Sequence, residues 1–171
     1  VVARSTDGGA TWGTFRQLAT DVNITGGPPG NDRWTFASGP GPGGTGQRVY
    51  LAWTRNVVES GSTDQRIVVS SSSDAGVTWS APVIVNDASI AGTDAGNLTA
   101  LPAVGPDGDL YLAWHDITGN RVMFDRSTDG GVTWGTDSVI TGTGVGFLIS
   151  IPPQNERGVG PTGALQADRS G

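Results

Sequence analysis

Short apolar runs, separated by clusters of Gly, Pro, Asp, Ser and Thr, recur along this chain of 171 residues in a fixed order. The run RVYLAWT at 48–54 matches DLYLAWH at 109–115, and a polar gap and another apolar run follow each of them. Nowhere do apolar residues keep a 3.6-residue spacing long enough to indicate a helix. The pattern therefore predicts an all-β protein built from short strands and tight turns.

The order of the runs predicts two complete units of four antiparallel strands. Strands are expected at 33–38, 48–54, 65–71 and 80–86, and again at 100–104, 109–115, 121–127 and 136–141. A recurring four-stranded unit of about 40–50 residues is the signature of a β-propeller blade.

The second strand of each unit is apolar at both odd and even positions, as in Tyr50-Leu51-Ala52-Trp53. Successive side chains of a strand point to opposite faces, so both faces of this strand are expected to be covered. Tyr50, Trp53 and their counterparts Tyr111 and Trp114 are accordingly predicted to be core residues and not ligand-stacking ones.

An octapeptide of the form Ser-x-Asp-x-Gly-x-Thr-Trp occurs three times, at 5–12, 72–79 and 127–134, each time between the third and fourth strands of a unit. Its Asp is expected to accept backbone N–H bonds, its Gly to take a positive φ, and its Trp to fold over the turn and become buried. Its spacing does not match a calcium-binding loop, so no metal is expected there. The predicted structural residues are Ser5, Asp7, Gly9, Trp12, Ser72, Asp74, Gly76, Trp79, Ser127, Asp129, Gly131 and Trp134.

These octapeptides resemble the Asp-box, the bacterial neuraminidase repeat, and the chain is similar over nearly its whole length to sialidase-type β-propellers. The resemblance implies a ring of six blades, of which this chain would supply about three. Residues 1–19 would form the last two strands of one blade, 33–86 and 100–141 one blade each, and 146–171, with GFLISI at 146–151 and GALQAD at 163–168, the start of another. We therefore expect a segment of a longer polypeptide, or part of a ring that another chain completes.

Composition excludes several kinds of site. The sequence has no cysteine and no lysine, which excludes disulfides, thiolate nucleophiles, Schiff-base lysines and phosphate-loop lysines. The single histidine, His115, cannot build a multi-histidine metal centre, and no cofactor is expected. The net charge of −6 argues against nucleic acid or anionic lipid as a partner, and no apolar run is long enough to cross a membrane. Arg in place of Lys and the acidic, Gly- and Thr-rich composition favour an exported bacterial protein.

In an up-and-down unit the octapeptides lie at the opposite end from the loops that follow the second and fourth strands. Those loops, near 20–32, 55–64, 87–99, 116–120 and 142–162, are the predicted ligand-facing surface. The candidate binding residues are Asp32, Arg33, Arg55, Glu59, Asp94, His115, Asp116, Glu156 and Arg157. Asn23 and Asn97 match the N-glycosylation pattern and are predicted to lie in the connections between units.

A sialidase-like site would need an arginine cluster that clamps a substrate carboxylate, an Asp acid/base and a Tyr nucleophile assisted by Glu. The family's Phe/Tyr-Arg-Ile-Pro motif is absent, and both tyrosines fall in predicted core strands. His115 and Asp116 are strand neighbours that point to opposite faces, so they do not form half of a triad. Two hypotheses remain open: a segment of a secreted exo-glycosidase that supplies scaffold and part of a glycan-facing surface, or a non-catalytic extracellular propeller module that binds glycan or protein.

Overall fold

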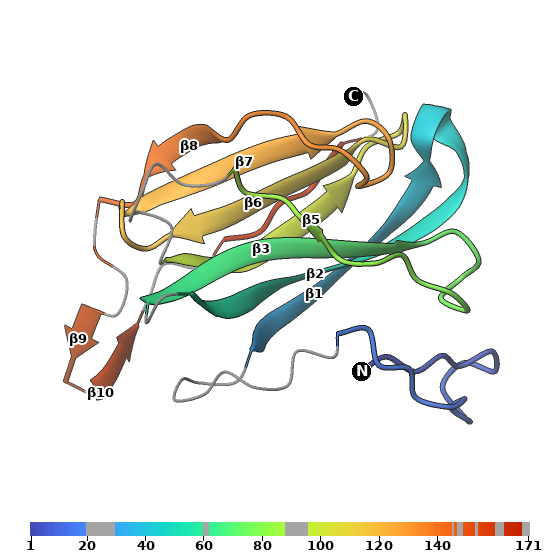
Figure 1. The fold of residues 1–171 in the computed structure, drawn as a ribbon, viewed down its shortest axis with the longest axis horizontal. Coiled ribbons are helices and arrows are strands. Elements are labelled where there is room, and N and C mark those ends of the chain that lie inside the picture. Colours follow the sequence, from blue (N-terminus) through green and yellow to red (C-terminus); the bar gives the residue numbers. More distant parts are fainter. Residues whose placement is uncertain are drawn as a thin grey trace.

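The computed structural model describes residues 1–19, 30–59, 62–87, 96–144, 146, 149–152, 154–159 and 163–168. Among these residues the regular structure is β-strand, apart from one 3-10 turn, and the prediction of an all-β chain is confirmed. The strands are β1 (Asn31–Gly41), β2 (Thr45–Glu59), β3 (Ser62–Ser72), β4 (Val83–Ile84), β5 (Asn97–Val104), β6 (Leu110–Asp116), β7 (Arg121–Ser127), β8 (Ser138–Gly142), β9 (Ile149–Ile151) and β10 (Gln154–Val159), with the 3-10 turn at Pro42–Gly44 (Figure 1).

Eight of these strands form two four-stranded antiparallel sheets. The first sheet has the order β1-β2-β3-β4 and the second has the order β5-β6-β7-β8, so both follow the order of the chain. The fourth strand of the first sheet is shorter than the predicted 80–86. The backbone just before and just after β4 is also hydrogen-bonded to β3. The Ser80 N–H donates to the Ser71 carbonyl (2.9 Å), and the Val85 N–H donates to the Ile67 carbonyl (2.8 Å).

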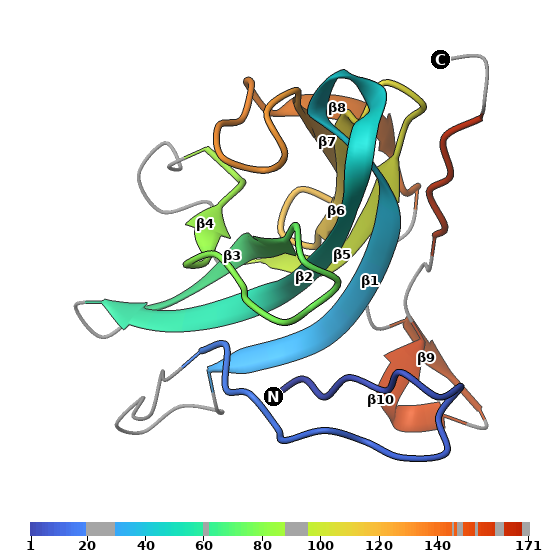
Figure 2. The same ribbon diagram turned by 90° about the vertical axis from the view of Figure 1, so that its right-hand side faces the viewer.

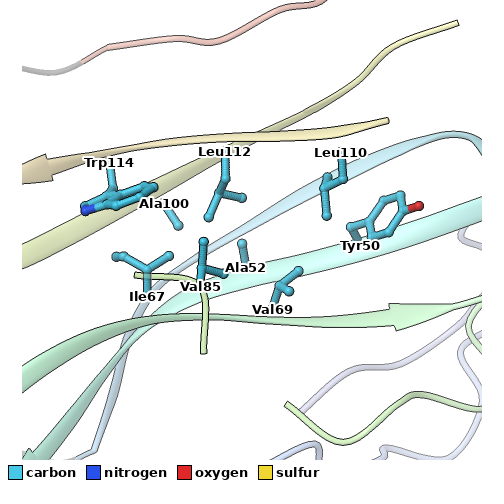
Figure 3. Packing of buried hydrophobic residues seen from close by; sticks show 9 residues of the cluster. All are labelled: Tyr50, Ala52, Ile67, Val69, Val85, Ala100, Leu110, Leu112 and Trp114. Carbon is cyan, nitrogen blue, oxygen red and sulfur yellow. The ribbon is translucent and has the colours of Figure 1, made fainter. Parts of the chain in front are cut away.

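The two sheets stack face to face, as the two views show (Figures 1 and 2). We call the face of each sheet that carries the Tyr and Ala of its Tyr-Leu-Ala-Trp segment the front face, and the opposite one, with the Leu and Trp, the back face. On the front face of the first sheet, Tyr50 lies opposite Leu110 of the back face of the second, and Ile67 lies opposite Trp114 at the other side of the cluster (Figure 3). The full buried cluster is Tyr50, Ala52, Ile67, Val69, Val85, Ala100, Leu110, Leu112 and Trp114.

The back face of the first sheet is also covered. Leu51, Trp53 and Val68 are almost completely buried, and the apolar residues Val2, Leu18, Ala19 and Trp79 pack against them. Full burial of an aliphatic or aromatic side chain stabilises a fold by about 1.5–3 kcal/mol, so covering both faces contributes strongly at every central strand. The prediction that Trp53 and Trp114 are core residues is confirmed, since neither is exposed.

The front face of the second sheet is less well covered. Residues 163–168 lie along it, and residues 165–168 enclose a pocket of about 210 Å³ with Tyr111 and Phe124. Tyr111 is therefore only half-buried, whereas its counterpart Tyr50 is fully buried as predicted. The expected strand at 163–168 is not formed, and residues 165–168 lie over the side chains of Tyr111 and Phe124 instead.

Two further segments differ from expectation. Of the described residues in 146–151, Ile149–Ile151 form β9, which pairs with β10 in a separate two-stranded hairpin. The first octapeptide is closed by a single antiparallel bridge between Val2 and Arg16, and the described part of residues 1–19 contains no longer strand. The described strands form no closed ring of sheets.

Candidate functional site

The stacked sheets have two chemically different ends. At one end, which we call the octapeptide end, lie the second and third octapeptides and the hairpin turns 41–45 and 105–109, which touch through the Gly44 N–H donating to the Asp107 carbonyl (2.8 Å). At the other end, which we call the polar end, β1 and β5 begin and β2 and β6 finish. Most of the described candidate binding residues lie there.

Each octapeptide turn is closed by hydrogen bonds from its own side chains. In the second copy the Ser72 hydroxyl donates to Asp74 Oδ1 (2.8 Å) and accepts from the Gly76 N–H (2.8 Å). The Thr78 N–H donates to Asp74 Oδ1 (2.8 Å) and its hydroxyl to Asp74 Oδ2 (2.6 Å). The same four bonds occur in both other copies. The Asp thus acts as a local backbone clamp, in the way its position in the turn predicts.

The glycine of each copy takes a positive φ, at 92° for Gly9, 83° for Gly76 and 86° for Gly131. Only glycine adopts this region without a steric cost from Cβ. At Gly131 the position is also crowded, because a Cβ there would lie 3.4 Å from Leu110 and 3.5 Å from Val69. The third octapeptide therefore sits on the core between the two sheets.

The three tryptophans differ in burial. Trp79 packs on the back face of the first sheet, and Trp134 packs against the cluster between the sheets. Trp12 is 63% exposed, so the expectation that this ring becomes buried is wrong. The reason is local: the first octapeptide belongs to a hairpin held by one bridge, and no four-stranded sheet of the described chain lies beneath its ring.

A groove of about 740 Å³ lies beside this exposed ring. Trp12, Phe15, Arg4 and Arg16 line it, together with Gly76, Val77 and small residues of the first hairpin. No carboxylate or histidine lines the groove, so it offers no acid–base group. We interpret it as open packing surface.

Hydrogen bonds to the clamp carboxylates lower their pKa values. Asp74 has its pKa lowered from the ordinary 3.8 to about 2, chiefly by the Thr78 hydroxyl and then by the Thr78 N–H. The pKa of Asp7 is lowered in the same way by Thr11. At Asp129 burial opposes the effect, yet the bonds from Thr133 and Ser127 still bring the pKa to about 2. Each clamp is therefore a carboxylate at neutral pH.

The polar end contains a strained backbone feature that occurs in both sheets. Arg33 in β1 and Thr99 in β5 take left-handed conformations, with φ of 57° and 60°. Each lies in a register shift of the first strand of its sheet, between Asp32 and Thr35 and between Leu98 and Leu101. A left-handed β-branched residue such as Thr is uncommon, and bulges of this kind re-aim side chains near functional sites.

The two bulges meet. Arg33 Nη1 donates to Thr99 Oγ1 (3.3 Å), and the Thr99 N–H donates to Thr54 Oγ1 (3.3 Å). Arg33 also approaches Asp32, with Nε 3.6 Å from Oδ2, and its side chain stays 39% exposed. The structure therefore connects β1, β2 and β5 through side chains at the polar end and leaves a guanidinium accessible there.

A second paired feature was not predicted from the sequence. The indole N–H of Trp53 donates to Asn31 Oδ1 (2.6 Å), and that of Trp114 donates to Asn97 Oδ1 (3.0 Å). Each Asn begins the first strand of its sheet. The two Asn residues stand at different distances before their Trp residues in the sequence, so aligning the units on their Tyr-Leu-Ala-Trp segments does not bring them together.

The hydrogen bond from Trp114 to Asn97 affects the prediction that Asn97 is a glycosylation site. Asn97 is 5% exposed and its side-chain oxygen accepts the indole bond. In the folded chain its side chain is therefore not presented for attachment of a glycan. Asn23 lies outside the described residues.

The remaining binding candidates are two buried residues, one residue at the rim, and four residues whose side chains the structure does not describe. Asp116 is buried and pairs with Arg121, whose Nη2 lies 2.5 Å from Asp116 Oδ2. His115 is 4% exposed, and burial, followed by the nearby Arg33 charge, lowers its pKa, so the ring is neutral at pH 7. Arg55 pairs in register with Asn31 at the rim of the polar end. Asp94 lies outside the described residues, and the described structure does not include the side chains of Glu59 in β2 or of Glu156 and Arg157 in β10.

The chemistry available at the described polar end is hydrogen bonding and ion pairing. Tyr50, which could in principle act as a nucleophile, lies toward the octapeptide end beside Gly131, and burial raises its pKa. The carboxylates Asp64 and Asp116 are bound by Arg66 and Arg121. The described residues contain no group of three or more His, Cys, Asp or Glu placed to hold a metal ion.

No protein-family model matches the chain. No curated protein matches it significantly either. Within the described part of the chain, no helix has the length and apolar character needed to cross a membrane.

The serine of the third octapeptide should be important for stability. Ser127→Ala removes the acceptor of the buried Gly131 N–H as well as the donor to Asp129, and should destabilise the fold by about 1–3 kcal/mol in urea unfolding. Ser5→Ala is the matched control, since it removes the same bonds from an exposed turn and water can replace them. Equal losses in the two variants would contradict the role assigned to burial.

The clamp should also be visible in acid. Because Asp74 has a lower pKa in the folded chain than the ordinary 3.8, its stabilising effect is full above pH 3.8 and is lost as the pH falls toward about 2. Thr78→Val removes the donor that contributes most, so the Asp74 carboxyl should titrate at higher pH, as measured by carboxyl ¹³C NMR. An unchanged Asp74 titration, with the Asp129 titration as internal reference, would refute this assignment.

Proposed function

We propose that this chain is a segment of a secreted sialidase-like Asp-box β-propeller, and that its polar end forms part of a glycan-facing surface. The observation that supports the proposal best is the set of three octapeptide turns closed by the same four side-chain bonds. Two of them sit at the same place in two sheets that stack front face to back face. Such turns identify architecture more directly than chemistry, so the ligand is argued separately from the polar end.

Arg33 is the side chain that best fits a role in ligand binding. It lies on a strained bulge, is 39% exposed, and is oriented by Asp32 and Thr99. A partly exposed guanidinium held in one orientation suits the carboxylate of an acidic sugar. This role is a proposal about one contact and does not require that the chain carry out catalysis.

Between the two forms of the proposal, the described residues favour a scaffold and binding role for this segment. Arg66 and Arg121 are paired with carboxylates of the chain itself, and Tyr50 is distant from Arg33. A glycosidase reaction would then depend on residues supplied by other blades. The alternative, a non-catalytic extracellular module that binds glycan or protein, uses the same surface without that chemistry.

The proposed partners are further blades, from the same polypeptide or from another chain. The front face of the second sheet supports this, because its counterpart in the first sheet, around Tyr50, is covered by a complete sheet. Tyr111 and Phe124 stack with ring centroids 6.0 Å apart beside a pocket that the 163–168 segment does not fill. The exposed Trp12, and Phe15 at 71% exposure, offer similar surface at the other side of the stack.

Glycan binding can be tested with sialyllactose as the probe, in titrations of the chain monitored by saturation-transfer NMR. Loss of one charge-assisted contact of about 1.5–3 kcal/mol should weaken binding at least about tenfold in Arg33→Ala. Arg126→Ala is the matched control, because Arg126 is an exposed arginine at the octapeptide end that pairs with Asp109. Binding that Arg33→Ala leaves unchanged, or that Arg126→Ala weakens equally, would remove the proposed surface.

A second measurement distinguishes the two forms of the proposal. Turnover of a fluorogenic sialoside by the longest polypeptide that contains this chain, with activity reduced in Arg33→Ala, is expected for a glycosidase. Binding of sialyllactose without turnover is expected for the non-catalytic module.

A further inference from the structure

A group of carboxylates joins the two sheets beside their fourth strands. The Asp87 N–H, just after β4, donates to Asp137 Oδ2 (3.0 Å), and the Asp137 N–H, just before β8, donates to Asp87 Oδ2 (3.0 Å). These reciprocal bonds link the fourth strands of the two sheets. They also place two negative charges close together, which is unfavourable unless other groups compensate.

A third carboxyl lies beside this link. Asp125 in β7 is 3% exposed, and its Oδ1 accepts the Arg126 N–H (2.6 Å) and the Gly135 N–H (3.1 Å). Its Oδ2 is buried and accepts no hydrogen bond from any residue that the structure describes. A buried ionised oxygen without a donor is costly, whereas a protonated oxygen is neutral and can donate.

The surroundings of Asp125 increase this cost. The pairing of β7 with β8 places Asp137, the residue before β8, next to Asp125. Asp87 of the first sheet also lies close enough for its charge to act on Asp125. The facing positions of β6 are Leu112 and its apolar neighbours. The neighbouring Arg126 side chain points to the other face of the sheet, where it pairs with Asp109 and lies over the Tyr111 ring.

The first sheet shows which chemistry this position favours. Ser70 in β3 stands two residues before its octapeptide serine, as Asp125 does, and it is also buried. The Ser70 hydroxyl donates to the carbonyl of Ser80, the residue that corresponds to Gly135. A neutral side chain therefore occupies the equivalent buried site of the first sheet.

We propose that Asp125 is a proton-dependent switch at this junction: its neutral carboxyl keeps the two sheets together, and its ionisation, with the proton released to solvent, loosens the Asp87–Asp137 link. Burial is the main reason why the pKa of Asp125 is raised. The two N–H bonds lower this pKa, and the Asp87 charge raises it further. Such a group binds its proton more tightly in the folded than in the unfolded chain. Its contribution is therefore full below the ordinary value of 3.8 and is lost as the pH rises through the folded value, opposite to the octapeptide clamps.

The first test compares thermal unfolding of the unmodified chain and Asp125→Asn from pH 4 to pH 9. Asn is neutral, nearly isosteric and keeps an acceptor for the two N–H groups, so the variant should melt higher at pH 9, by roughly 3 °C or more. The difference should shrink as the pH falls, because the two chains converge only below the ordinary value of 3.8, where Asp125 is protonated in both the folded and the unfolded state. A difference that does not change with pH would overturn the proposal. Asp125→Ser, which copies Ser70, repeats the comparison if the Asn variant does not fold.

The second test needs no change at Asp125. Carboxyl ¹³C NMR of the folded chain should show Asp125 titrating above 3.8, and Asp87→Asn should move that titration to lower pH by removing the neighbouring charge. Asp32→Asn, the same change at the polar end, should leave it in place. At a pH where Asp125 is ionised, the amide hydrogens of Asp87 and Asp137 should exchange faster in the unmodified chain than in Asp125→Asn at the same pH. Titration of Asp125 at or below 3.8, or indifference to Asp87→Asn, would refute the switch.

Discussion

Every central strand of this chain must bury both of its faces, and the rest of the structure follows from that requirement. Successive residues of a strand point to opposite sides, so a segment such as Tyr50-Leu51-Ala52-Trp53 is apolar on both. One sheet alone would leave both of these faces in water. Stacking the front face of the first sheet on the back face of the second solves this for Tyr50 and Trp114 together, and residues 1–19 and 163–168 continue the same arrangement on either side.

This requirement also separates architecture from ligand chemistry. Because the faces are occupied by packing, only the two ends of the stack are available for polar groups. The octapeptide end is closed by turns that satisfy their own backbone, so the same turn works exposed at Asp7 and against the core at Asp129. The polar end carries bulges, ion pairs and the accessible Arg33 guanidinium. Function is therefore more readily placed at the end where local geometry departs from the regular ladder.

The sequence was sufficient for features that depend on local pattern. Eight strands and their order follow from alternation and turn residues, and the octapeptide bonds follow from Ser, Asp, Gly and Thr at fixed offsets. Features that depend on what lies across a face were not predictable. Trp12 has the same octapeptide as Trp134 and yet is exposed, because its burial needs a sheet beneath it. The 163–168 segment has strand-like alternation but lies over the side chains of Tyr111 and Phe124 without forming a strand. His115 is buried by the layers around it, which strand parity alone could not show.

Comparison of the two units shows where the chain has specialised. Positions that both sheets share, such as the Asn31–Trp53 bond and the octapeptide clamps, serve the common architecture. Three of the differences occur at the polar end, where Arg33, Thr54 and Arg55 of the first unit correspond to Thr99, His115 and Asp116 of the second. The fourth, Ser70 against Asp125, lies on the junction between the sheets. Architecture alone would permit the same residue in both units, since the backbone at these positions is alike. The differences in charge and hydrogen-bonding capacity at these positions are therefore not required by the backbone that the two units share.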